Sequence, residues 1–113
     1  MDSPVIALAC GDYPRTRLMR ESQVDLGGAR LVYISLSPAE IFWRMLKFDE
    51  FDASEMSLSA YIMGLSRGDT RFVAIPVFPS RAFRHSFIFV NRRSGILRPE
   101  DLRGKRVGCL STT

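Results

Sequence analysis

The residues best suited to chemistry lie between two apolar runs, residues 72–78 and 86–91. This connection contains two arginines, the single histidine and two serines, namely Ser80, Arg81, Arg84, His85 and Ser86. A guanidinium binds a carboxylate through two parallel hydrogen bonds, and an imidazole can move a proton near neutral pH. Because polar connections between buried strands often carry the chemistry of α/β proteins, we expect a site for an anionic substrate here.

The elements that must position these side chains alternate along the chain. Apolar runs predict strands, and cap residues with helical periodicity predict helices. The expected strands cover residues 5–10, 30–36, 72–78, 86–91 and 106–110, with a short extended piece in 51–57, and the expected helices cover 15–22, a stretch beginning at 38, 58–67 and a short turn near 98. This alternation predicts an α/β fold with a mainly parallel sheet and helices on both faces.

Composition excludes several classes of protein. The 113 residues are 46% hydrophobic and 25% charged, which is typical of one soluble globular domain. The longest apolar run, residues 5–10, is far too short to span a membrane. The net charge is +4, yet no nucleic-acid-binding motif accompanies it, so we expect no nucleic-acid partner. No export signal precedes Cys10, so a cytoplasmic location is expected.

The two cysteines, Cys10 and Cys109, each fall in a predicted buried strand. Their spacing matches neither a zinc site nor a disulfide scaffold, so both are predicted to be reduced core thiols. The single histidine and the scattered carboxylates form no recognisable ligand set, and no glycine-rich nucleotide loop is present. We therefore expect no metal and no cofactor.

Five collinear segments carry a resemblance to a known family. They are residues 8–13 (LACGDY), 40–46 (EIFWRML), 51–59 (FDASEMSLS), 72–91 and 101–108 (DLRGKRVG). Together they resemble the N-terminal part of the 4,5-dihydroxyphthalate decarboxylase family. The resemblance implies a two-lobed fold like that of type II periplasmic binding proteins, truncated here to a first lobe at 1–95 and an incomplete second lobe at 96–113.

The resemblance also implies a reaction, in which 4,5-dihydroxyphthalate loses one carboxylate to give 3,4-dihydroxybenzoate and carbon dioxide. Such a site needs cations for two carboxylates, a proton donor for the ring carbon and a group that polarises a phenol. His85 and Glu55 are the expected catalytic residues. The expected substrate-binding residues are Arg81, Arg84, Ser80, Ser86, Ser57, Ser59, Asp12, Tyr13 and Arg17.

Each assignment has a structural alternative. The arginines can form surface ion pairs, His85 can be a structural histidine, Glu55 can stabilise a helix terminus, and Ser57 and Ser59 can be helix caps. At the level of function, the alternative is a substrate-binding protein of a small-anion transporter, without catalysis. The isolated chain is expected to be inactive, and exposed lobe surface is expected to favour self-association.

Overall fold

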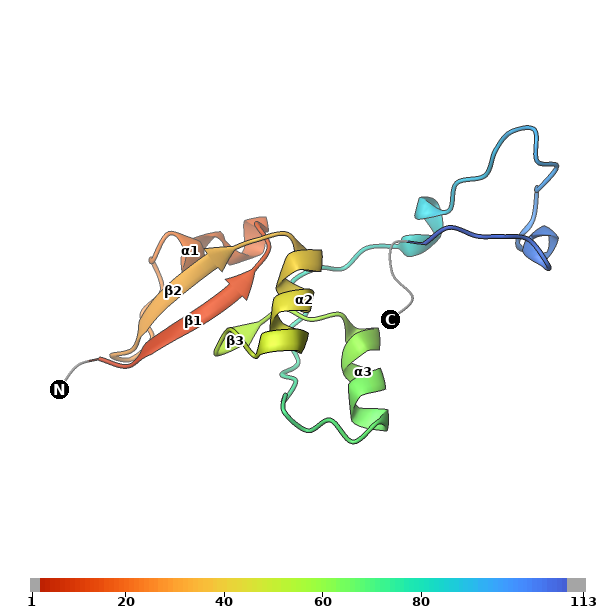
Figure 1. Cartoon of the computed structure of the whole chain (residues 1–113). Coiled ribbons are helices and arrows are strands. Elements are labelled where there is room, and N and C mark those ends of the chain that lie inside the picture. Colours follow the sequence, from red (N-terminus) through yellow and green to blue (C-terminus); the bar gives the residue numbers. More distant parts are fainter. Residues whose placement is uncertain (1–2, 110–113) are drawn as a thin grey trace. The chain divides into compact units, whose positions relative to one another are not determined.

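The computed structural model describes residues 3–109, except that the side chains of Arg84 and His85 lie outside the described part. The chain divides into two compact units, with the boundary between Ser80 and Arg81. All of the strands in the described residues belong to the first unit (Figure 1). The predicted lobe boundary after residue 95 stays a prediction.

The first unit contains a three-stranded parallel sheet. Its central strand is β1 (Val5–Cys10), which lies between β2 (Arg30–Ser35) and the short β3 (Ala53–Ser54). The register places Val5 opposite Arg30 and Cys10 opposite Ser35. The first two strands therefore form where the apolar runs predicted them, and the sheet is parallel as expected.

Side-chain caps explain where the helices begin. The helix α2 (Pro38–Phe48) starts where the Ser37 hydroxyl accepts a hydrogen bond from the Glu40 N–H, and α3 (Leu58–Ser66) starts at the same kind of cap on Ser57. A 3-10 turn, η1 (Pro14–Thr16), leads into the short helix α1 (Arg17–Arg20). Within residues 3–109, no helix is long and apolar enough to cross a membrane.

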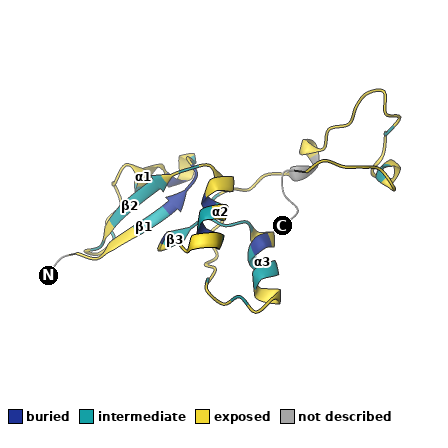
Figure 2. Ribbon diagram, viewed as in Figure 1, coloured by how far each residue is buried: buried dark blue, intermediate teal, exposed yellow. Residues whose placement is uncertain are grey.

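Alternation along β2 places helices on both faces of the sheet. Ile34 packs against the buried cluster of Ala9, Ile41, Met45 and Phe51, which joins α2 to the sheet (Figure 2). Leu31, three positions earlier and so on the opposite face, lines a pocket with Met19 of α1. The prediction of helices on both faces is thus confirmed for this unit.

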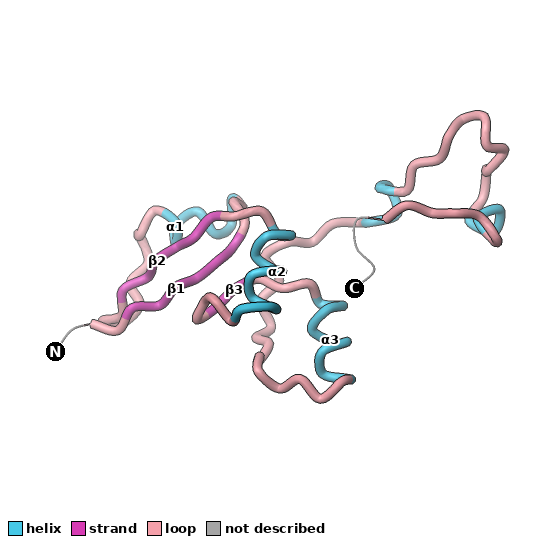
Figure 3. Tube along the Cα trace, in the orientation of Figure 1, coloured by secondary structure: helices cyan, strands magenta, loops and turns pink. Residues whose placement is uncertain are grey.

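Three predicted strands do not form in the described residues, and residue 110, the last of the third, lies outside them. Residues 72–78, 86–91 and 106–109 contain no strand, and Val73 and Phe89 are 89% and 86% exposed (Figure 3). Short 3-10 helices, η2 (Arg84–Phe87) and η3 (Pro99–Leu102), are the regular elements described after residue 80. Apolar content favours burial, but a strand also needs a neighbour for its backbone hydrogen bonds, and no such neighbour is paired with these segments.

Two local predictions also need correction. Cys10 is buried as expected, whereas Cys109 is exposed because the strand predicted around it does not form. The helix predicted over residues 15–22 is shorter, because η1 and α1 together cover Pro14–Arg20, and Tyr13 occupies the cap position of η1 without a side-chain cap bond.

Replacing Ile41, which is fully buried, tests the core. We expect Ile41→Ala to lower the free energy of unfolding by about 2–5 kcal/mol, because it removes packed methyl groups and leaves a cavity. Urea unfolding followed by circular dichroism measures the change. Ile62→Ala on α3 is the matched control, since Ile62 is 56% exposed and should lose far less. Equal losses in the two variants would contradict the assigned core.

Candidate functional site

Glu55 organises a polar cluster at the carboxyl ends of the parallel strands. Its N–H donates to the Ala9 carbonyl (3.0 Å), which extends the β1–β3 pairing by one bond. Its carboxylate Oε1 accepts from the Gly11 N–H at 2.6 Å, directly after β1. The Tyr13 hydroxyl donates to Oε2 at 2.9 Å and lies 3.2 Å from Oε1. Ligands of α/β proteins bind at this end of the strands, so the position favours function.

The Tyr13 ring folds back over the end of its own strand. A Cβ atom placed on Gly11 would lie 2.8 Å from Tyr13 Cζ and 2.9 Å from the Tyr13 hydroxyl oxygen, which is too close for two non-bonded atoms. Gly11 is buried, and its missing side chain supplies the space that the ring occupies. The hydrogen bond from Tyr13 to Glu55 therefore depends on glycine at this position.

Tyr33 and Thr16 hold the turn that carries Tyr13. The Tyr33 hydroxyl donates to the Gly11 carbonyl at 2.7 Å and lies 2.9 Å from Thr16 Oγ1. Thr16 is buried, and its hydroxyl donates to the Tyr13 carbonyl at 3.1 Å. Neither residue was predicted from the sequence. A tyrosine inside a predicted buried strand was the available signal, because its hydroxyl needs a polar partner.

Burial keeps the two phenols and the thiol of this cluster protonated. It raises the pKa of Tyr33 to about 12, and it also raises the pKa of the Cys10 thiol. The pKa of Tyr13 is raised by burial first and by the adjacent Glu55 carboxylate second, while Ser80 acts in the opposite direction. At neutral pH both phenols are therefore hydrogen-bond donors, and Tyr13 presents its proton to Glu55.

The two serines after Glu55 belong to the start of α3. Ser57 Oγ accepts from the Ala60 N–H, and it lies 2.8 Å from Ser59 Oγ. The capping role considered for Ser57 is therefore present. Both hydroxyls are close to Glu55 in the chain, and a role in binding substrate stays a prediction for them.

Asp12 and Arg17, also predicted to bind substrate, have partners on the surface. Asp12 pairs with Arg20, and Arg17 Nε lies 2.8 Å from the Glu21 carboxylate one helical turn away. Exposed pairs of this kind contribute little to stability and can be exchanged for a ligand. The first unit thus brings Glu55 and Tyr13 into contact, and leaves Asp12 and Arg17 in ion pairs.

Ser80 is the last residue of the first unit, and the arginines and the histidine that follow it belong to the second unit. Arg81 is exposed, and the exposed Ser86 donates from its hydroxyl to the Phe83 carbonyl at 3.1 Å. The side chains of Arg84 and His85 lie outside the described residues. The predicted setting of this connection, between two buried strands, is wrong because neither strand forms. The catalytic and binding roles of these residues stay predictions.

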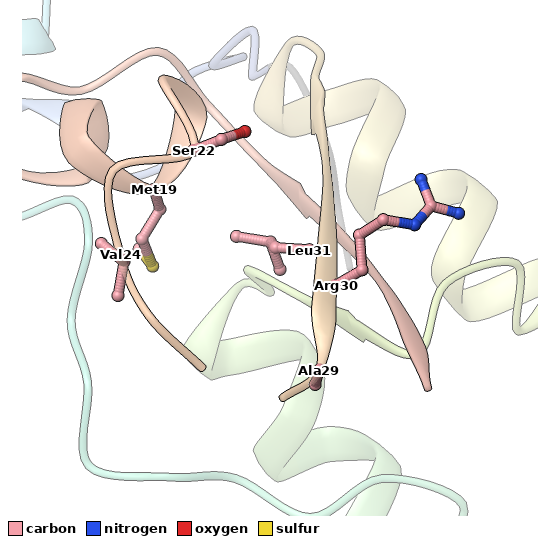
Figure 4. Close-up of a pocket in the computed structure, with 6 residues that line it drawn as sticks. All are labelled: Met19, Ser22, Val24, Ala29, Arg30 and Leu31. Atoms are coloured by element: carbon pink, nitrogen blue, oxygen red, sulfur yellow. The ribbon is translucent and has the colours of Figure 1, made fainter. Parts of the chain in front are cut away.

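Two further features of the described residues bear on where a metal ion or a ligand could bind. Within them, no group of three or more His, Cys, Asp or Glu side chains is placed to hold a metal ion. A pocket of about 180 Å³ lies at the beginning of β2, at the opposite end of that strand from Glu55 (Figure 4). Its lining combines apolar side chains with Ser22 and Arg30, and the Arg30 guanidinium points to the other side of the strand from Leu31.

Comparison with known proteins confirms the resemblance derived from the sequence. The chain is 41% identical over 103 residues to a 4,5-dihydroxyphthalate decarboxylase of Comamonas testosteroni. The matched segment makes up 91% of this chain and 31% of the relative. It is 38% identical over 103 residues to a protein of the same name from Pseudomonas putida. Here the matched segment makes up 91% of this chain and 40% of that relative. The chain spans less than half the length of these curated relatives. No family model matches it.

The raised pKa of Tyr33 predicts a loss of stability at alkaline pH. An unfolded tyrosine ionises near pH 10, whereas folded Tyr33 ionises at about 12, so the folded state retains the proton longer. The contribution of Tyr33 to the free energy of unfolding is complete below pH 10 and is lost as the pH rises towards 12. Urea unfolding at pH 9, 10 and 11 should show a steeper decline for the wild type than for Tyr33→Phe. If the free energy of unfolding fell equally with pH in both proteins, the raised pKa of Tyr33 would be contradicted.

Proposed function

We propose that this chain, related in sequence to 4,5-dihydroxyphthalate decarboxylases over 91% of its length, is part of an enzyme that removes one carboxylate from 4,5-dihydroxyphthalate. The observation that carries the proposal is the Glu55 carboxylate, which is fixed by a backbone N–H and already accepts a hydrogen bond from a phenol. The names of the relatives favour this enzyme over a transporter's binding protein.

The reaction needs a base that faces a hydroxyl of the substrate. The carbon that loses its carboxylate is para to one hydroxyl, so partial transfer of that proton to Glu55 pushes electron density into the ring. An acid then protonates the para carbon, the carbon–carbon bond to the carboxylate breaks, and carbon dioxide leaves. Glu55 returns its proton to the phenolate oxygen. The product, 3,4-dihydroxybenzoate, keeps the proton that the acid supplied.

The geometry around Glu55 supports the role of base. The Gly11 N–H fixes Oε1 at 2.6 Å, so the carboxylate is oriented before a substrate arrives. The N-terminus of α3 follows directly, and its Ser57 and Ser59 hydroxyls are hydrogen-bonding groups near the positive end of a helix dipole. These features suit an anionic aromatic substrate that carries hydroxyl groups.

The remaining proposed roles belong to residues 80–86, of which Ser80 lies in the first unit and the others in the second. Arg81 and Arg84 are the proposed cations for the two carboxylates, because a guanidinium binds a carboxylate in a bidentate fork. His85 is the proposed acid for the ring carbon, and Ser80 and Ser86 are proposed to bind substrate oxygens. Since the chain spans less than half of its relatives, we expect catalysis to need the whole length of such a protein.

A chimeric enzyme tests the proposed function. The segment of the Comamonas testosteroni relative that matches this chain is replaced by the corresponding 103 residues. We expect the chimera to release carbon dioxide from 4,5-dihydroxyphthalate and to form 3,4-dihydroxybenzoate, while the 113-residue chain alone releases none. A folded chimera that binds this compound without turnover would favour the binding-protein function and contradict the proposal.

Variants of the active chimera test the two proposed catalytic residues. Glu55→Gln and His85→Ala should each lower kcat by about 100-fold or more, because each removes a group that transfers a proton. Glu50→Gln is the matched control, since Glu50 is an exposed carboxylate paired with Arg44. Wild-type rates in either catalytic variant would remove that residue from the mechanism. A loss of kcat no larger than that of Glu50→Gln would also remove the residue from the mechanism.

A further inference from the structure

The Tyr13 phenol occupies the acceptor atoms that a hydroxylated ligand would need. Glu55 Oε1 is engaged by the Gly11 N–H at 2.6 Å, and Oε2 accepts from the Tyr13 hydroxyl at 2.9 Å. Among the described residues, the donor to Oε2 is the Tyr13 hydroxyl, which also lies 3.2 Å from Oε1, so an aromatic O–H group already occupies the side of the carboxylate that faces away from the Gly11 N–H. The contact between Tyr13 and Glu55 has the same chemistry as the contact between a phenolic substrate and a base.

The position of Tyr13 allows its side chain to rotate away from the Glu55 carboxylate. It lies in the connection between β1 and η1, with extended backbone angles and a side chain that is only partly buried. Its ring rests over Gly11, which has no side chain, and apart from Glu55 the side chain that interacts with its hydroxyl is that of Ser80, an exposed-loop residue at the end of the first unit. Tyr33 and Thr16 bind the carbonyl oxygens of Gly11 and Tyr13, so the backbone of the turn stays held when the Tyr13 side chain rotates.

We propose that Tyr13 is an internal substitute for the ligand's hydroxyl, and that a hydroxylated aromatic ligand binds Glu55 by displacing it. This inference rests on the proposed function, because it takes the ligand of Glu55 to be a phenol. It assigns Tyr13 a role opposite to that of an ordinary binding residue: Tyr13 competes with the ligand. Removing the Tyr13 hydroxyl should therefore tighten binding.

Three variants of the 113-residue chain separate competition from assistance. Tyr13→Phe removes the competing hydroxyl and adds no atoms. Gly11→Ala keeps the hydroxyl but places a Cβ 2.8 Å from Tyr13 Cζ, which forces the ring away from Glu55. Tyr61→Phe is the matched control, because the Tyr61 hydroxyl accepts from the Ala74 N–H in another part of the first unit.

Three probes separate hydroxyl recognition from carboxylate recognition. Catechol carries two hydroxyls and no carboxylate, phthalate carries two carboxylates and no hydroxyl, and 4,5-dihydroxyphthalate carries both. Each is titrated into chain with ¹³C-labelled tyrosine rings, and binding is followed by NMR. The chain has three tyrosines, so the Tyr13 signal is identified by its loss in Tyr13→Phe.

We expect catechol and 4,5-dihydroxyphthalate to shift the Tyr13 ring signal and phthalate to leave it unchanged. Tyr13→Phe and Gly11→Ala should bind catechol about two- to tenfold more tightly than the wild type, the range that one net hydrogen bond provides. Tyr61→Phe should bind it as the wild type does. Tyr13→Phe decides the question if Gly11→Ala unfolds the chain.

The outcomes distinguish this inference from the proposed function. Catechol affinity that is unchanged or weaker in Tyr13→Phe, or the absence of any catechol effect on Tyr13, would overturn the inference. Phthalate binding in that case would leave the anion-binding part of the proposed function standing. Displacement of Tyr13 by catechol, combined with no effect of added carboxylates on affinity, would support the inference and count against a dicarboxylate substrate.

Discussion

The hydrogen bonds of Glu55 are the constraint on which the candidate site depends. Through its N–H it continues the pairing between β3 and β1, and through its carboxylate it binds the residue that follows β1. Gly11 and Glu55 are 44 positions apart in the chain, so the hydrogen bonds of Glu55 hold two distant segments together. The phenol of Tyr13 reaches the carboxylate only because both segments are held there.

Polar groups behind this contact are paired as well. Tyr33 and Thr16 bind the carbonyls of the turn, and within the described part of the chain no buried side-chain nitrogen or oxygen lacks a hydrogen-bond partner. Unpaired polar groups are costly at low dielectric, so a paired network defines one arrangement of the turn. A rigid turn that carries one rotatable phenol fits a site that exchanges an internal donor for an external one.

The second constraint is the small extent of the sheet. β3 pairs with β1 over two residues, and the apolar segments after residue 72 are not paired with any strand in the described part of the chain. Large side chains such as Val73, Phe89 and Leu97 consequently remain between 86% and 90% exposed. The fully buried core is confined to the contact between α2 and the sheet, where Ile41 and Ala9 meet.

The sequence by itself determined the elements whose signals are local. The strands at 5–10 and 30–35, the helix starts at Ser37 and Ser57 and the burial of Cys10 all followed from residues within a few positions of one another, and the candidacy of Glu55 followed from the family resemblance. Only the tertiary structure decided that Tyr13 is the partner of Glu55, that Tyr33 and Thr16 hold the turn, and that the later apolar runs form no strands. The reason is that caps and apolar runs act over a few residues, whereas strand pairing and the contacts of Tyr33 and Glu55 join segments 22 to 44 positions apart and depend on which surfaces meet.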